Sequence, residues 1–380
     1  MMEKSVSKNY LYNLGYQLLT LLTPFLVIPY LSRVLGAEGI GAYSYTLSIA
    51  AYFILLANLG TTDYAQREVA YQTGQRRAQS RIFWETWLLR AALTVLSLAL
   101  YYGLVERMAA SSLIYWVQAL NIVAVLFDVT WFFQGLEEFG KIVLRNFFVR
   151  LLNVALVFLL IHGTEDLLLY VALMGGMTLL SGLLMWLSLP RYLVRVPIGE
   201  IRPWRNFGMV LSLFLPQMAI QLYTVLDKTM IGVLTGALVE NGYYAQAEKV
   251  VKMPLLVMTA LGAVMTPRIS ALYAAGDEKA IGAHIMRSYR FVWLLALPMA
   301  VGLAGTISYV TPWFFGAGFE KVEPLVKVMS GMVIAIGLSN VTGLQYLLAV
   351  NRQNHLTISC LIGAAVNVLL NWFLIPKFLS

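Results

Sequence analysis

About eleven apolar stretches, each long enough to cross a lipid bilayer as a helix, follow one another along the 380 residues. A transmembrane helix needs about 20 consecutive, mostly apolar residues because the hydrocarbon core of a bilayer is about 30 Å thick. The stretches meet this requirement and do not show the short alternating segments of a membrane β-barrel. The expected spans are 10–31, 40–60, 82–104, 112–134, 142–162, 166–189, 207–232, 243–265, 288–310, 325–349 and 355–376. The sequence therefore predicts an all-α polytopic membrane protein.

The composition excludes most other classes of protein. Hydrophobic residues make up 59% of the chain and charged residues only 12%, whereas a soluble domain carries about 25% charged residues. The single cysteine, Cys360, and three scattered histidines exclude a disulfide framework and a metal cluster. The sequence contains no phosphate-binding loop pattern, which argues against ATP hydrolysis. We therefore expect neither an enzyme nor a protein with a cofactor.

The basic residues predict how the chain lies in the membrane. The formal charge is +8, with 27 lysines and arginines that fall mostly between the apolar stretches. Placing the N-terminus in the cytoplasm puts sixteen of them in inside segments and four in outside segments. Such an excess on one side is typical of cytoplasmic loops. The charge thus indicates membrane orientation rather than nucleic acid binding. The basic stretches 61–81 and 190–206 are expected to lie along the inner leaflet.

Two halves of the sequence resemble each other, which predicts an internal repeat. Gly41 matches Gly242 at an offset of 201, as does Arg67 with Arg268, and Gly74 matches Gly276 at 202. Later, Asn153 matches Asn367 at 214. Six spans in the first half give both halves the same direction, so the repeats are parallel. We expect an N-terminal six-helix bundle over 1–189, a basic cytoplasmic linker over 190–206 and a five-helix bundle over 207–380.

The repeat also makes a prediction about the end of the chain. The sixth span of the first half begins near residue 166, and the same offset of 214 places its counterpart at residue 380. We therefore expect the second bundle to lack its last helix or helices, as in a fragment of a longer protein. The alternative is a natural protein with eleven helices.

Three segments resemble the bacterial polysaccharide flippase family. They are PFLVIPYLSRVLGAEGIGAYSYTLSI, FDVTWFFQGLEEFGKIVLRN at 127–146, and LPQMAIQLYTVLDKTMIGVLTG at 215–236 with the stretch that follows it to 270. This family, within the multidrug, oligosaccharidyl-lipid and polysaccharide exporter superfamily, handles repeat units of O-antigen, capsule and exopolysaccharide. The resemblance implies two helical bundles around a cationic central cavity in the bacterial cytoplasmic membrane. It implies alternating access that flips undecaprenyl-diphosphate-linked oligosaccharides, with membrane lipid and polysaccharide-assembly proteins as further candidate partners.

Polar stripes on two expected helices are candidates for a cavity lining. Asn13, Gln17, Thr20 and Pro24 recur on one face of the first helix, and Gln217, Gln221, Thr224 and Lys228 repeat that spacing on the seventh. Such stripes mark either a polar lining or hydrogen bonding between helices. The lysine favours a lining. Asp227 is its counter-charge or a separate ionisable group that could bind a coupling ion.

Further charges lie deep within the expected spans. A lysine or arginine at mid-bilayer costs about 2.5–3.5 kcal/mol on insertion scales, so it is expected to be functional. Arg150 with Asn153 on the fifth span, and Arg90 on the third, are therefore candidates for binding an anionic cargo. Asp128 on the fourth span is a second coupling-ion candidate. Glu248 and Lys252 are expected to neutralise each other at i and i+4.

The sequence leaves several functions open. The leading hypothesis is a lipid-linked oligosaccharide flippase, because the candidate lining charges Arg90, Arg150 and Lys228 are cationic and suit a diphosphate. A multidrug or cation antiporter of the same superfamily would need an acidic and aromatic site instead. An inactive truncated remnant is a third hypothesis. A membrane polymerase is disfavoured because the expected outside loops are short.

Overall fold

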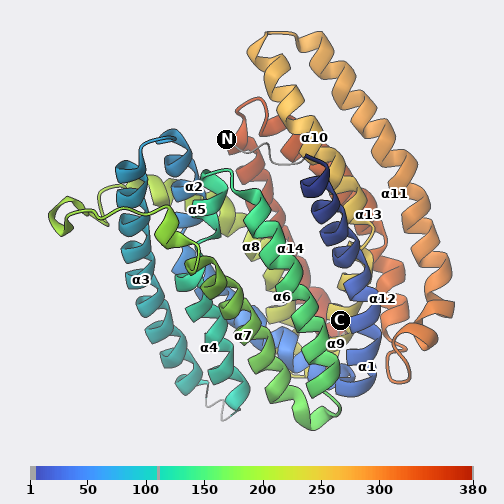
Figure 1. Ribbon diagram of the computed structural model, residues 1–380. Coiled ribbons are helices and arrows are strands. Elements are labelled where there is room, and N and C mark those ends of the chain that lie inside the picture. Colours follow the sequence, from blue (N-terminus) through green and yellow to red (C-terminus); the bar gives the residue numbers. More distant parts are fainter. Residues whose placement is uncertain (1–5, 109–111, 379–380) are drawn as a thin grey trace. The chain divides into compact units, whose positions relative to one another are not determined.

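The computed structural model describes residues 6–108 and 112–378, where all regular structure is helical (Figure 1). Within these ranges the described side chains exclude 6–18, 21, 215–217, 219–220, 222–223, 256–257, 259–261 and 263–264. The α-helices are α1 (Val6–Asn58), α2 (Thr61–Tyr71), α3 (Arg76–Arg107), α4 (Leu113–Phe127), α5 (Thr130–Gly135), α6 (Phe139–Leu160), α7 (Leu167–Trp186), α8 (Phe207–Thr235), α9 (Leu238–Lys252), α10 (Leu255–Ala274), α11 (Glu278–Phe314), α12 (Val322–Met329), α13 (Gly331–Ser339) and α14 (Gln353–Phe378). Short 3₁₀ turns are η1 (Thr164–Asp166), η2 (Leu189–Arg191) and η3 (Ile198–Glu200), and η4 (Asn340–Leu347) is a π-helix.

The helices confirm a polytopic membrane protein. In the described part of the chain, eight helical segments are long and apolar enough to span a bilayer. The expected number of about eleven is not confirmed. Several expected spans do not form separate continuous helices. Spans 10–31 and 40–60 both fall within α1, where Gly36 interrupts the helix with a left-handed φ of 65°. Span 243–265 is divided between α9 and α10, and span 325–349 between α12, α13 and η4.

The chain forms two compact units whose limits follow packing rather than the order of the sequence. Unit 1 comprises Met1–Val27 and Tyr45–Val225, and unit 2 comprises Ile28–Ser44 and Leu226–Ser380. The bundles expected over 1–189 and 207–380 stay a prediction; by contacts, segment 28–44 groups with unit 2, and the chain passes from unit 1 to unit 2 between Val225 and Leu226. The expected linker 190–206 belongs to unit 1.

Unit 1 is built around an aromatic core. Trp131, Phe132 and Phe133 of the short helix α5 are buried and pack with Phe83 of α3. The rings of Phe83 and Trp131 are stacked with their centroids 5.6 Å apart, and Phe132 meets Phe83 edge to face. Gly135 allows α5 to rest directly on α2, since a Cβ there would overlap Gln66 and Val69. The α2–α3–α5 cluster thus gives unit 1 a rigid end.

Unit 2 contains a close contact between the two sequence repeats. A Cβ added at Gly41 would overlap the carbonyl group of Leu238, and one added at Gly242 would overlap that of Ala37. Residues 37 and 238 differ by 201 positions, as do residues 41 and 242. The two contacts are therefore equivalent under the repeat, in the reciprocal pattern that a two-fold axis produces.

Backbone conformation supports the same repeat. Gly36 and Gly236 both have a φ of 65°, and Gly74 and Gly276 have φ values of 83° and 72°. These pairs are separated by 200 and 202 positions. A left-handed backbone at matched positions is expected when two halves of a chain share a fold, because such a conformation favours glycine.

Candidate functional site

Two lysines bind one carboxylate in unit 2, and a third lysine follows that carboxylate in the sequence. Lys228 of α8 and Lys252 of α9 bind different oxygens of Glu248, with Nζ–O distances of 2.7 and 2.6 Å. Helix α9 continues from Glu248 to Lys249, whose side chain is exposed. The Glu248 side chain is only 9% exposed, against 25% for Lys228 and 42% for Lys252. The cluster therefore carries two more positive than negative charges, and its lysines are more accessible than its carboxylate.

Asp227 belongs to a different set of contacts. Its Oδ2 accepts a hydrogen bond from the Tyr244 hydroxyl at 2.6 Å, and its Oδ1 accepts one from the Asn371 amide at 2.7 Å. The Asn371 amide also donates to Asn367 Oδ1 at 3.2 Å. Of the two roles that the sequence left open, this geometry fits a separate ionisable group, since Lys228 pairs with Glu248. Helices α8, α9 and α14 supply this oxygen-rich cluster.

The amide stripes are only partly described. Gln221 is exposed on α8, and its Oε1 lies 3.3 Å from the Thr224 hydroxyl. The side chains of Gln17 and Gln217 lie outside the described residues. Of the stripe expected on the seventh span, the structure describes the side chains of Gln221, Thr224 and Lys228, and all three lie on α8.

Arg150 and Asn153 lie one turn apart on α6 of unit 1. Arg150 donates to the Thr20 hydroxyl at 3.1 Å. The Asn153 amide nitrogen contacts Met174 Sδ at 3.7 Å, while its Oδ1 is buried without a hydrogen-bond partner among the described residues. Both side chains are partly accessible, so they remain candidates for polar contacts with a cargo.

Arg90 lies in the core of unit 1 rather than on an accessible surface. It is 2% exposed. Its guanidinium group donates to the Thr61 and Thr62 hydroxyls, to Asn58 Oδ1 at 3.1 Å and to the Asp128 carbonyl at 2.7 Å. These acceptors lie where α1 gives way to α2 and where α4 ends. Arg90 therefore connects the junction between α1 and α2 to the junction between α4 and α5. We leave it out of the proposed cargo-binding residues.

Asp128 shapes the same break between α4 and α5. Its carboxylate accepts a hydrogen bond from the Thr130 backbone nitrogen at 3.0 Å. Its carbonyl oxygen accepts from Arg90 and from the Trp131 indole. The side chain of Asp128 thus starts α5, which positions the aromatic core, and this local role makes it a weaker coupling-ion candidate than Asp227.

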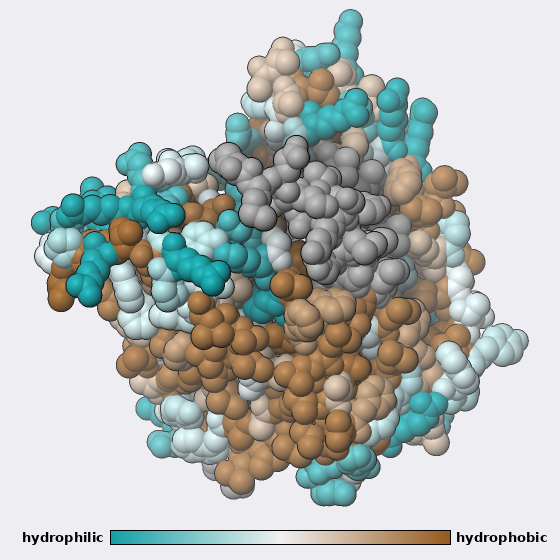
Figure 2. All heavy atoms as spheres, in the orientation of Figure 1, coloured by the Kyte–Doolittle hydropathy of each residue, from teal (hydrophilic) through white to brown (hydrophobic). Residues whose placement is uncertain are grey.

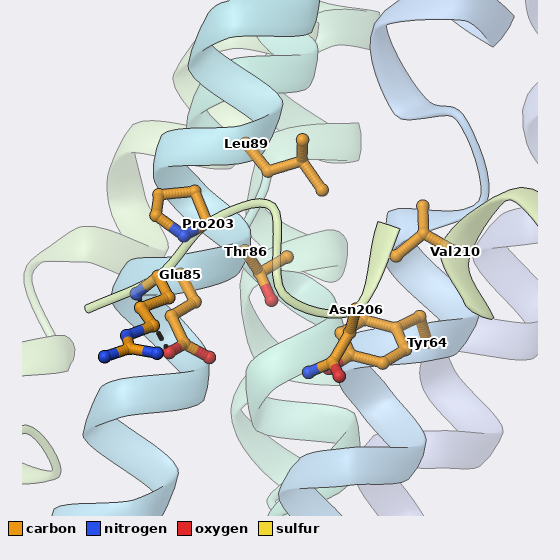
Figure 3. Close-up of a pocket in the computed structure, with 8 residues that line it drawn as sticks. Tyr64, Glu85, Thr86, Leu89, Pro203, Asn206 and Val210 are labelled. Carbon is orange, nitrogen blue, oxygen red and sulfur yellow. Dashed lines mark hydrogen bonds between the residues drawn. The ribbon is translucent and has the colours of Figure 1, made fainter. Parts of the chain in front are cut away.

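A small cavity lies between α2, α3 and the chain after α7, also within unit 1 (Figure 3). Glu85 and Thr86 of α3 approach it from one side and Tyr64 of α2 from the other. Its remaining lining residues are Leu89, Arg202, Pro203, Asn206 and Val210. In the described part of the chain, no cluster of three or more His, Cys, Asp or Glu side chains could hold a metal ion.

Sequence reasoning missed the grouping of these residues more than their identity. Lys252 was expected to form a neutral pair with Glu248 alone, because spacing within one helix says nothing about Lys228 on another helix. Tyr244 and Asn371 were not expected near Asp227. The offset of 214 that matches Asn153 with Asn367 did point to α14, but not to its contact with α8.

Comparison with known proteins identifies relatives of the chain. The model of the family described as "Polysaccharide biosynthesis protein" matches residues 6–273. A putative O-antigen transporter of Escherichia coli K12 is 22% identical over 96% of this chain and 89% of its own length. That of Shigella dysenteriae is 23% identical over 92% and 87%. The lipid II flippase MurJ of Bacillus subtilis is 24% identical over 40% of this chain and 30% of its own length.

A solved structure has a similar fold. It is an inward-facing multidrug resistance transporter of the MATE family in the MOP superfamily. The TM-score is 0.66 with 14% sequence identity, and the match covers 92% of this chain and 84% of the other. At this identity the likeness concerns the fold alone.

Proposed function

The chain belongs to the polysaccharide biosynthesis protein family, and from this premise we propose that it flips undecaprenyl-diphosphate-linked oligosaccharides across the bacterial cytoplasmic membrane. Its relatives along most of their length are named as O-antigen transporters, and a more partial relative is named as a lipid II flippase. Transport by alternating access, with the N-terminus in the cytoplasm, is part of this proposal. It has the support of the superfamily fold and of the distribution of basic residues.

The observation that carries the proposal is the lysine cluster around Glu248. A diphosphate bears about two negative charges, and it needs cations that are not neutralised by their own surroundings. Lys228 and Lys252 each bind one oxygen of the Glu248 carboxylate, and Lys249, the next residue on α9, adds a third positive charge beside it. The cluster therefore offers the surplus positive charge that an anionic headgroup requires. A transporter of cationic drugs would instead need an excess of negative charge at its binding site.

We also propose roles for the remaining candidates. Arg150 and Asn153 of unit 1 are proposed to contact the cargo, since both residues are half-buried rather than fully buried and Asn153 Oδ1 has no hydrogen-bond partner among the described residues. Gln221, with Gln17 and Gln217, is proposed to bind sugar hydroxyls. Asp227 is proposed as the group that binds a coupling ion, because Tyr244, Asn371 and Asn367 bring further oxygen atoms to its surroundings.

Deletion of the gene from its bacterial host tests the proposal. We expect loss of a surface polysaccharide and accumulation of its lipid-linked precursor, both reversed by the wild-type gene and not by the Lys228→Gln variant at equal protein level. The matched control is Lys377→Gln, an exposed lysine at the end of α14. Unchanged polysaccharide together with increased sensitivity to cationic drugs would instead assign the chain to multidrug export.

A further inference from the structure

Residues 190–206, which we call the strap, are fixed to unit 1 along their length. The Val194 backbone nitrogen donates to the Ser80 hydroxyl at 2.9 Å. The Arg202 backbone nitrogen donates to Glu85 Oε1 at 3.1 Å, a bond drawn in Figure 3. Between these points, Glu200 pairs with Arg77 at 2.5 Å. Helix α3 thus holds the strap at three successive places.

The two ends of the strap are held as well. At its start, the Tyr192 hydroxyl is hydrogen-bonded to Lys141, whose ammonium group lies 4.2 Å from the centre of the Tyr192 ring. At its end, the Asn206 amide donates to the Tyr64 hydroxyl. Pro203 and Asn206 line the small cavity between these elements. The backbone of the strap therefore has a defined position, and its outward side chains form a fixed surface.

That surface is basic. Four arginines of the strap, Arg191, Arg195, Arg202 and Arg205, are exposed. The strap contains one carboxylate, Glu200, which pairs with Arg77 of α3 rather than with any of these four. The strap thus presents four guanidinium groups, which form bidentate hydrogen bonds to phosphate more readily than lysines do.

Large apolar side chains lie among these arginines. Ile198 is 88% exposed and Trp204 is 59% exposed. Figure 2 shows hydrophilic and hydrophobic side chains intermingled where the strap projects at the left of the view. Neither residue belongs to the helical segments that are long and apolar enough to span a bilayer. Their exposure is therefore not explained by contact with lipid tails along a span.

Tryptophan and arginine beside isolated aliphatic side chains are typical of segments that lie in the membrane interface. The strap connects the ends of α7 and α8, so it is tied to the membrane surface on both sides. We propose that it binds the phosphate headgroups of anionic phospholipids through its arginines, with Ile198 and Trp204 inserted between the headgroups. The positive charge of the surface favours an anionic headgroup over a neutral one, and the fixed backbone holds the arginines in position to bind it.

Lipid binding to the purified protein tests the charge. Arginine near an anionic membrane surface contributes a factor of roughly five in affinity, so Arg195→Gln with Arg202→Gln should weaken phosphatidylglycerol binding roughly 25-fold. Binding of phosphatidylcholine should not change. The matched control removes two charges elsewhere, with Arg107→Gln and Lys377→Gln, and should have little effect. Equal loss in both double variants would overturn the proposal, because it would show only a dependence on net charge.

A fluorescent label tests the insertion. Because Cys360 is the only cysteine, a Cys360→Ser variant with Ile198→Cys takes one label on the strap. In nanodiscs with anionic lipid, we expect strong quenching by lipids that carry a spin label near the headgroup. A label at Ala275, exposed in the turn that also carries Asp277 and Glu278, is the control and should be quenched weakly. A label at position 198 that is accessible to water-soluble quenchers alone would overturn the proposal. Shielding by a soluble protein without lipid quenching would assign the strap to a protein partner.

Discussion

Gly41 and Gly242 hold equivalent positions in the two sequence repeats and pack against each other in unit 2. A Cβ at Gly41 would lie 2.9 Å from the backbone nitrogen of Gly242. Each glycine also meets the backbone four residues before the other, at Leu238 and Ala37. The contact explains why segment 28–44 belongs to unit 2, although it is part of the first repeat. It also explains why both positions require the smallest side chain.

Replacing either glycine by alanine should destabilise the protein. The new methyl group would meet backbone atoms, which cannot move aside as a flexible side chain can, and overpacking of this kind costs about 1–3 kcal/mol. We expect Gly41→Ala and Gly242→Ala to lower the Tm in detergent by similar amounts, since their contacts are reciprocal. Gly103→Ala on α3 is the control, because a Cβ there has open space and alanine favours a helix. Unaltered Tm values in both variants would argue against the contact.

The sequence predicted the repeat because glycines and arginines recur at nearly constant offsets. It did not predict that the repeats meet at Gly41 and Gly242, since an offset between two positions contains no information on their distance. Long apolar stretches likewise predicted membrane helices but not their breaks. Gly36 interrupts α1 because its backbone has a positive φ. The sequence alone does not reveal this role, because glycine within a span is also common where helices pack closely.

Arg90 should be required for folding rather than for cargo binding. Replacement by methionine removes the guanidinium donor that Asn58, Thr61, Thr62 and Asp128 share, and each buried group left unsatisfied costs about 1–3 kcal/mol. Lysine keeps the charge but lacks the planar fork that reaches acceptors on two chain breaks. We expect both Arg90→Met and Arg90→Lys to lower the Tm strongly. Arg150→Lys, with one described hydrogen bond to Thr20, should lower it little. A stable Arg90→Lys variant that loses transport would return Arg90 to the cargo-binding candidates.

Depth in a span was the reason to consider Arg90 and Lys228 together, and the structure separates them. Both are basic residues within long apolar stretches, so the sequence alone gives no reason to assign them different roles. Their difference arises from neighbours that are distant in sequence: hydroxyl groups of α2 surround Arg90, whereas Lys228 meets a carboxylate that Lys252 already binds. Only the three-dimensional arrangement shows which of the two basic residues lies in a cluster with more positive than negative charges.

Asp227→Asn should uncouple transport from its ion gradient. The substitution keeps the shape of the side chain and one acceptor oxygen but removes the charge that a coupling ion would bind. We expect transport in proteoliposomes to lose its response to imposed proton and sodium gradients, with a small change in Tm. Tyr244→Phe is the control, since it removes the hydrogen bond to Asp227 and keeps the carboxylate. Because it also removes one of the oxygens near Asp227, it should weaken the gradient response without abolishing it. A gradient response equal to that of the wild type in Asp227→Asn would exclude this residue as the coupling group.

The lysine cluster offers a test of whether charge surplus or one particular side chain binds the cargo. Lys228→Gln lowers the surplus from two charges to one, and a single charge against a diphosphate contributes on the order of 1–4 kcal/mol at effective dielectric constants of 20–80. We expect a clear loss of surface polysaccharide at equal protein level, with partial retention in Lys228→Arg.

Adding Glu248→Gln to Lys228→Gln restores the surplus to two, because Lys249 and Lys252 then face no carboxylate within the cluster. If the surplus attracts the diphosphate, the double variant should regain part of the activity that Lys228→Gln loses. Glu248→Gln alone leaves three lysines together, and their mutual repulsion should lower the Tm. Polysaccharide and Tm measured for all three variants separate these effects. A double variant as inactive as Lys228→Gln, with a Tm close to that of the wild type, would mean that Lys228 itself contacts the cargo.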